Sequence, residues 1–192
     1  MGTFTFDISN PFPSGYTGPH GGPGEDGHAS GRWYETAGND LGANPGTRVH
    51  AVFDGRVSKV DRTHIGSTTG PAYGAGIFVR ASGPGLNPSA GDGIGCYYTH
   101  LTLGSGITEG AMITRGQVMG EIVAVSDIPS HLHFAIGVRT NENYVGVNIY
   151  ETLKATANTS DVTTLTVSGG GGVSGGSATT PDEHEPLVLP EN

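Results

Sequence analysis

The stretch His-Leu-His-Phe-Ala-Ile-Gly-Val at residues 131–138 carries the clearest structural pattern in the chain. Successive side chains of a β-strand point to opposite faces, so alternate positions share a face. The apolar face would consist of Leu132, Phe134, Ile136 and Val138. His131 and His133 would share the other face, about 6.5–7 Å apart. We therefore expect the apolar face to enter the core and the two imidazoles to stand over a groove.

Other strands are predicted on both sides of this stretch. Asp54-Gly55 is a strong two-residue turn signal between strand-forming runs and predicts a hairpin over residues 47–61. Further strand-like runs cover residues 77–80, 94–101 and 111–125. Sustained helical periodicity is missing before Tyr144. The sequence thus predicts a mainly β fold, a compact antiparallel sheet with a groove that bears a metal site, followed by a flexible tail.

Two connecting regions bear on domain organisation. Residues 82–93 are rich in Gly, Pro, Asn and Asp, and we expect this loop to form a wall of the groove and set its shape. We divide the chain into a lead segment (1–27), a metallopeptidase domain (28–154) and a linker with an acidic tail (155–192). The Gly-rich tail is interpreted either as dispensable or as a docking peptide for a larger assembly.

Composition excludes several classes of partner. The chain has 18 acidic and 9 basic side chains and a formal net charge of −9, whereas nucleic-acid binders cluster Lys and Arg. Cys96 is the only cysteine, so any metal must be held by His and carboxylate. Long apolar runs are lacking, and residues 1–10 do not resemble a standard secretion signal. We expect no nucleic-acid partner and no membrane insertion.

Two more stretches supply candidate functional residues. His100 lies at the end of a predicted strand beside aromatic neighbours, and Asp40 precedes a turn and a strand. Each observation alone is ordinary. In order along the chain, however, they resemble the lysostaphin-like, LytM-type zinc peptidases, which are peptidoglycan endopeptidases. The resemblance covers residues 40–153 and rests on Asp40, Gly-Thr-Arg-Val-His-Ala (46–51), Tyr-Thr-His-Leu (98–101), Gly-Gln-Val-Met-Gly (116–120) and His-Leu-His-Phe (131–134).

The resemblance implies a role for four side chains. In this family the Asp and the second His of His-x-His bind zinc, which gives Asp40 and His133 metal-binding roles. His100 and His131 inherit the roles of catalytic histidines that do not bind the metal. Two His and one carboxylate leave a fourth tetrahedral position for water, whose pKa zinc lowers toward about 7.

The first zinc ligand departs from the common family pattern. Many members have His four residues before the Asp, where this chain has Thr36, and a Thr cannot replace a neutral imidazole at a zinc site. The β-lytic branch of the family places this ligand farther upstream. His28 is then the first candidate, His20 the second and Glu35 a weaker third.

These residues lead to one function and two alternatives. We expect a Zn²⁺-dependent endopeptidase that cuts stem or cross-bridge peptides of bacterial peptidoglycan, acting outside the cytoplasm or in the cell wall or periplasm. Delivery by a phage or an injection-type particle would account for the lack of a standard signal. A degenerate relative could instead be a binding or assembly module, which Thr36 favours. A sugar-phosphotransfer carrier domain would need no His-x-His pair.

Overall fold

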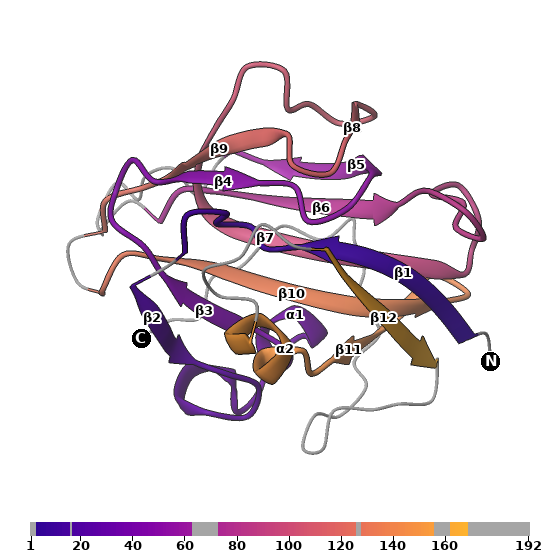
Figure 1. The fold of residues 1–192 in the computed structure, drawn as a ribbon, viewed down its shortest axis with the longest axis horizontal. Helices are drawn as coiled ribbons and strands as arrows, with labels where there is room; N and C mark the ends of the chain where they lie inside the picture. The colour runs from indigo at the N-terminus through magenta and orange to yellow at the C-terminus, as the bar shows by residue number, and fades with distance from the viewer. Residues whose placement is uncertain (1–2, 16, 63–72, 126–127, 156–161, 169–192) are drawn as a thin grey trace.

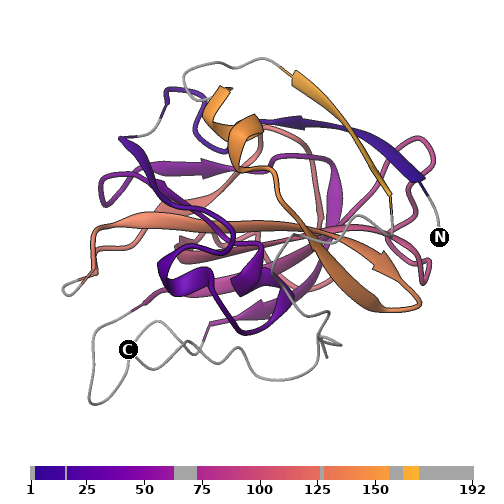
Figure 2. The ribbon, with the colours of Figure 1, turned by 90° about the horizontal axis from the view of Figure 1, so that it is seen from below.

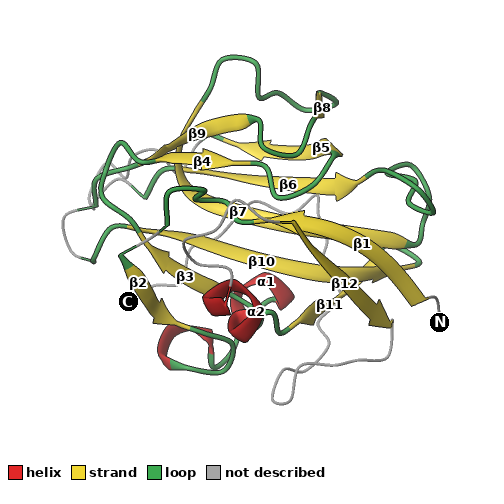
Figure 3. Ribbon diagram, viewed as in Figure 1, coloured by secondary structure: helices red, strands yellow, loops and turns green. Residues whose placement is uncertain are grey.

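A computed structural model describes residues 3–15, 17–62, 73–125, 128–155 and 162–168. Strands dominate these residues, and helices are short (Figure 3). The strands are β1 (Thr3–Ser9), β2 (Gly18–Gly21), β3 (Asn39–Gly42), β4 (Arg48–His50), β5 (Gly55–Asp61), β6 (Ala75–Ala81), β7 (Gly93–Leu103), β8 (Met112–Ile113), β9 (Val118–Ile122), β10 (His131–Thr140), β11 (Asn143–Val147) and β12 (Val162–Ser168). The helices are η1 (Asp26–His28), a 3-10 turn, α1 (Trp33–Thr36) and α2 (Tyr150–Ala155).

A ten-stranded sheet forms the body of the described fold (Figure 1). Its main path runs β2-β3-β10-β7-β6-β5-β8, while β11 pairs with β10, and β9 joins both β4 and β7. Every pairing is antiparallel. The predicted antiparallel β fold is confirmed.

The two faces of the sheet bury different side chains. The apolar residues of β10 predicted to point inward lie in the main hydrophobic core. A second, aromatic cluster covers the opposite face and consists of Trp33, Tyr34, Phe78, Tyr97, Ala135 and Tyr144. Figure 2 shows the β1–β12 ribbon and α1 on opposite sides of β10. The predicted division of β10 is therefore confirmed, although its second face is partly covered as well.

Helix α1 was not predicted, because four residues are too short to show a helical period. Its Trp33 ring stacks on Tyr144 at 4.8 Å between centroids and an interplanar angle of 9°. Beneath it, Gly137 and Gly146 leave room that a Cβ would fill: the Cβ would lie 2.9 Å from the Trp33 ring and 2.3 Å from the Ala37 Cβ, respectively. The two glycines thus allow α1 to pack directly on the sheet.

The hairpin predicted over residues 47–61 is wrong. Strand β4 pairs with β9, whereas β5 pairs with β6 and β8. Asp54 therefore does not close a two-residue turn; its Oδ1 accepts a hydrogen bond of 2.7 Å from the Arg115 backbone N–H. Gly55 instead begins β5 where a Cβ would come within 2.6 Å of the Arg80 carbonyl oxygen. A close approach of strands, rather than a turn, accounts for this glycine.

Loop 82–93 lies far from the histidines, so its predicted part in shaping their groove is also wrong. It connects β6 to β7 and ends at Gly93, which pairs with Arg139. His133 is six positions before Arg139 on the same strand, a separation of about 20 Å at the usual rise per residue. The loop composition was interpreted correctly, but composition does not reveal which end of a strand a loop occupies.

The segments predicted to flank the domain contribute strands to the structure. Strand β2, within the expected lead segment, pairs with β3, and β1 pairs with β12 over seven residues. The tail beyond residue 168, to which the docking prediction refers, lies outside the described residues. The short helix α2 follows β11. None of the described helices is long and apolar enough to span a membrane.

Candidate metal centre

Strand register brings most of the candidate residues together. On β10, His133 pairs with Asp40 of β3 on one side and with Thr99 of β7 on the other. His131 lies two positions before His133 and therefore on the same face, and His100 directly follows Thr99. Antiparallel pairing thus gathers residues that are up to 93 positions apart in the sequence.

Three side chains converge closely enough to hold one metal ion. Asp40 Oδ1 lies 3.0 Å from His133 Nδ1 and 3.3 Å from His28 Nε2, and the two histidine nitrogens are 3.3 Å apart. The three candidate ligand atoms all lie within 4.8 Å of one another. Nitrogen and oxygen donors at this spacing match the donor set of zinc, which prefers four tetrahedral ligands at about 2.0–2.2 Å.

Backbone carbonyls orient both histidines of this trio. His28 Nδ1 lies 3.1 Å from the Gly22 carbonyl oxygen, and His133 Nε2 lies 2.9 Å from that of Tyr34. If each of these nitrogens donates its proton, the other ring nitrogen is the one that faces Asp40. Metal-binding histidines in proteins commonly have this arrangement, which selects the tautomer and holds the ring in place.

His100 and His131 lie beside the trio, and a backbone carbonyl orients each of their rings in the same way. His100 Nδ1 is 2.8 Å from the Tyr73 carbonyl oxygen and His131 Nδ1 is 2.6 Å from that of Pro129. Their ring centroids are 4.6 Å apart, and His131 Nε2 lies 3.5 Å from Asp40 Oδ1. His100 has a φ of 70°, a conformation rare outside glycine that is found preferentially at functional sites.

Burial and pairing shift the protonation of these groups. Burial would raise the pKa of Asp40, but hydrogen bonds with His133 and His28 outweigh it and hold this pKa well below its usual range. Burial likewise opposes the charged form of His133, yet its hydrogen bond with Asp40 raises its pKa to about 9. Burial and the nearby His131 lower the pKa of His100 to about 3. At neutral pH and without metal, these shifts make Asp40 a carboxylate, His133 an imidazolium and His100 a neutral imidazole.

The structure also locates the alternatives for the first ligand. His20 lies in β2, but its side chain is outside the described set. Thr36 points its hydroxyl at the Arg32 and Trp33 carbonyl oxygens of its own helix, at 3.3 and 3.4 Å. Glu35 is not among the residues whose ligand atoms converge. Of the described candidates for the first ligand, only His28 joins Asp40 and His133.

The groups that orient the histidines could not be predicted from the sequence. All four acceptors are backbone carbonyls, those of Gly22, Tyr34, Tyr73 and Pro129, and any residue type supplies a carbonyl. Helix α1, which carries one of them, was also missed. The spacing of His-x-His could identify the reactive side chains but not these partners.

Comparisons with known proteins agree with the architecture. The model of peptidase family M23 matches residues 34–147, more than half of the chain. His28 lies just upstream of the matched region. A search of curated proteins found no match.

Solved structures share the fold at low sequence identity. The antimicrobial peptidase lysostaphin from Staphylococcus simulans has a TM-score of 0.50 and 19% identity, over 93% of this chain and 60% of that one. A solution structure of lysostaphin has a TM-score of 0.51, again with 19% identity and the same coverage. A zinc-containing peptidase from Vibrio cholerae has a TM-score of 0.48 and 20% identity, over 72% and 39%. The chain therefore spans less than two thirds of the length of each of these three proteins.

Proposed function

Because this chain belongs to peptidase family M23, we propose that it is a zinc-dependent endopeptidase that hydrolyses peptide bonds in bacterial peptidoglycan. The observation that carries the proposal is the convergence of His28, Asp40 and His133, whose ligand atoms lie within 4.8 Å of one another. Two imidazoles and one carboxylate leave the fourth tetrahedral position open, as hydrolytic zinc centres require.

The residues around the trio suit peptide hydrolysis. When bound, zinc supplies Lewis-acid catalysis, polarising the scissile carbonyl and making water more acidic. His100 Nδ1 lies 2.8 Å from the Tyr73 carbonyl oxygen, so with the proton on Nδ1 the Nε2 of His100 can accept a proton from the attacking water. As an imidazolium it can then return that proton to the leaving amine. His131 lies beside His100 with its Nε2 3.5 Å from Asp40 Oδ1, and in its protonated form it can stabilise the developing oxyanion by donating a hydrogen bond from Nε2.

The substrate class rests on the family and on the shared fold. Lysostaphin, which has this fold at 19% identity, is an antimicrobial peptidase. We propose stem or cross-bridge peptides as substrates, and the cell wall or periplasm as the site of action. Degradation of the wall as an endolysin, with delivery by a phage or an injection-type particle, would be consistent with such a location. Docking of the residues beyond 168 to a larger assembly is part of the same proposal.

Zinc content and wall hydrolysis, measured on the same preparations, test this function. The intact chain loaded with zinc should hold about one zinc per chain and release new amino groups from purified peptidoglycan. His28→Ala should lose both properties, since removing one ligand lowers zinc affinity by orders of magnitude. His20→Ala is the matched control and should keep both. If His20→Ala loses zinc and His28→Ala retains it, the first ligand is His20.

Thr36 favours a second candidate, a metallopeptidase-like module without catalysis, because it replaces the ligand common in the family. Such a module would bind peptidoglycan or an assembly partner without cutting. An intact chain that binds no zinc even in excess metal would support it over the enzyme.

A further inference from the structure

We propose that Gly38 is a positioning residue for the metal centre: its missing side chain allows His28 and His133 to approach one another closely enough to share one ion. The inference rests on the proposed metal site and adds a residue to it. Gly38 touches neither the substrate nor the reacting atoms, so its effect would pass through the two histidines.

The space beside Gly38 is filled by the two candidate ligands. A Cβ at this position would lie 2.4 Å from His133 Cε1 and 2.8 Å from His28 Cδ2. Real Cβ atoms essentially never approach other heavy atoms within 3.0 Å. Any side chain at position 38 would thus lie between the two imidazoles, and at least one ring would have to move.

The backbone of Gly38 cannot easily move to make that room. Its N–H donates to the Glu35 carbonyl oxygen at 2.9 Å, which ties it to the end of α1. The same carbonyl oxygen would lie 2.9 Å from the added Cβ. Helix α1 is in turn packed on the sheet through Trp33 and Tyr144. The peptide is therefore tied to α1, and the Glu35 carbonyl encloses the position of the added Cβ together with the two histidines.

The histidine rings are confined as well. His133 is held by its strand and by the Tyr34 carbonyl, and His28 by the Gly22 carbonyl. A shift of either ring would change the 3.3 Å separation of His28 Nε2 and His133 Nδ1. Because a metal site tolerates little displacement of its ligands, the cost should appear as lost metal affinity.

Gly38 also differs from the glycines that serve backbone geometry. It does not adopt the left-handed conformation that favours glycine, unlike Gly31 with a φ of 116°. Gly38→Ala therefore tests volume between the rings and not backbone strain. Gly27 is the matched control: it lies next to His28, has no such φ, and an added Cβ there would meet nothing within 4 Å.

The experiment measures zinc affinity by competition with a chromophoric chelator, on intact chains stripped of metal. We expect Gly38→Ala to bind zinc about 10–100-fold more weakly than the original chain, the loss usual when a group that supports metal ligands is disturbed. Gly27→Ala should bind like the original chain. With Co²⁺ as the metal, Gly38→Ala should also show a changed visible absorption spectrum, which a uniformly destabilised fold would not produce.

A double-mutant cycle keeps the proposal testable if the single variant is unstable. In metal-free chains, Gly38→Ala should lower the melting temperature less in a His28→Ala background, because one of the two clashing rings is gone. Equal zinc affinity in Gly38→Ala and the original chain would overturn the proposal, as would equal losses of melting temperature in both backgrounds. If the original chain itself binds no zinc, the proposed function fails instead, which is a distinguishable result.

Discussion

One face of β10 carries histidines at one end and an arginine at the other, and the two ends differ in the hydrogen bonds that their side chains can make. His131 begins the row on β10, and Arg139, an even number of residues later, lies on the same face at the other end. At the histidine end each ring gives one nitrogen to a backbone carbonyl and directs the other toward a shared centre. At the arginine end, guanidiniums that only donate hydrogen bonds surround one carboxylate. The first arrangement can exchange protons and bind a cation, whereas the second can only hold other groups in place.

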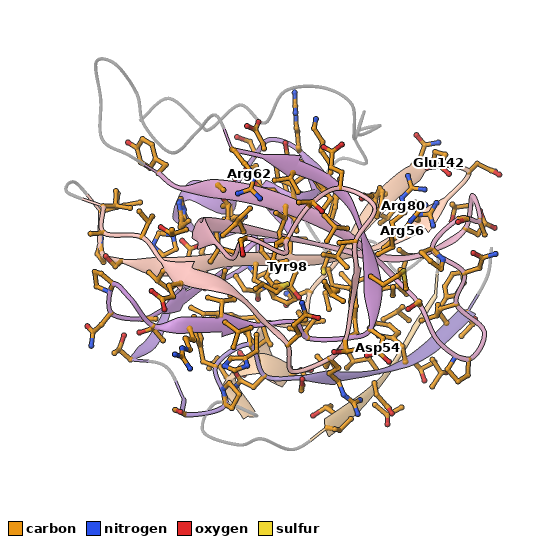
Figure 4. The ribbon with its side chains drawn as sticks, turned by 90° about the horizontal axis from the view of Figure 1, so that it is seen from above. Asp54, Arg56, Arg62, Arg80, Tyr98 and Glu142 are labelled. Carbon is orange, nitrogen blue, oxygen red and sulfur yellow. The ribbon has the colours of Figure 1, made fainter. Side chains whose placement is uncertain are left out.

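The arginine end consists of Arg56, Arg80 and Arg139 with Glu142. Figure 4 shows Arg56, Arg80 and Glu142 gathered together, and Arg56 and Arg80 are paired across β5 and β6. The Glu142 carboxylate bridges two guanidiniums, at 2.7 Å from Arg80 Nη2 and 3.0 Å from Arg139 Nη1.

Two arginines of this end also bind the loop at residues 82–93. Arg139 Nη1 donates to the Ala90 carbonyl oxygen, and Arg56 Nη2 lies 3.5 Å from that of Pro88. This set of contacts anchors the loop. These contacts give the loop a structural role in place of the predicted role in shaping the groove.

Removal of single histidines should produce the largest effects. His133→Ala should release zinc, because it removes a proposed ligand, with a loss of affinity of several orders of magnitude. His100→Ala and His131→Ala should keep zinc and lose turnover by about 10²–10⁴-fold, the usual contribution of a general acid or base. Metal content and peptidoglycan hydrolysis are measured on each variant. Equal zinc loss in all three variants would show that ligands and catalytic histidines are not distinct.

The free energy of unfolding should depend on pH through the histidine end and not through the arginine end. The folded-state pKa of His133 is raised to about 9, so its stabilising contribution is complete below about pH 6.5 and is lost as pH rises toward 9. The pKa of His100 is lowered to about 3, so its contribution is present above about pH 6.5 and is lost toward acid. Metal-free protein should therefore be most stable near pH 6.5.

Urea denaturation from pH 5 to 9.5 measures this profile, and the fall on the alkaline side should amount to a few kcal/mol. The arginines stay charged throughout this range and should contribute nothing to it. A metal-free chain whose stability rises steadily from pH 6.5 to 9 would contradict the pairing of His133 with Asp40.

Glu142→Gln should have the smallest effect and leave the metal centre intact. It removes the carboxylate that bridges Arg80 and Arg139, the latter fully buried. Because Glu142 itself is about half exposed, we expect a loss of only about 1–2 kcal/mol in the free energy of unfolding. The pH profile should keep its shape at lower stability, and zinc affinity should not change. Weaker zinc binding in this variant would mean that the two ends are coupled through β10.

The alternation of residues 131–138 was sufficient to predict an antiparallel strand with an apolar face and a histidine face, because that pattern is a local property of the strand. The order of motifs also singled out Asp40, His100, His131 and His133. It left the first ligand open among three residues, since a loop of twelve or more residues can reach the same point from several starting positions. Only the tertiary structure brought His28 beside Asp40.

Pairing and packing decided the remaining features. The sequence indicated β4 and β5 but paired them with each other, because a local turn signal carries no information on distant strands. It recognised loop 82–93 but not the end of the sheet at which it lies. The carbonyls that orient the histidines and the space at Gly38 have no side-chain signature. Sequence by itself determined which groups could react and which face they share, while tertiary structure decided what surrounds them, because carbonyl positions and interatomic gaps arise only when separate segments pack together.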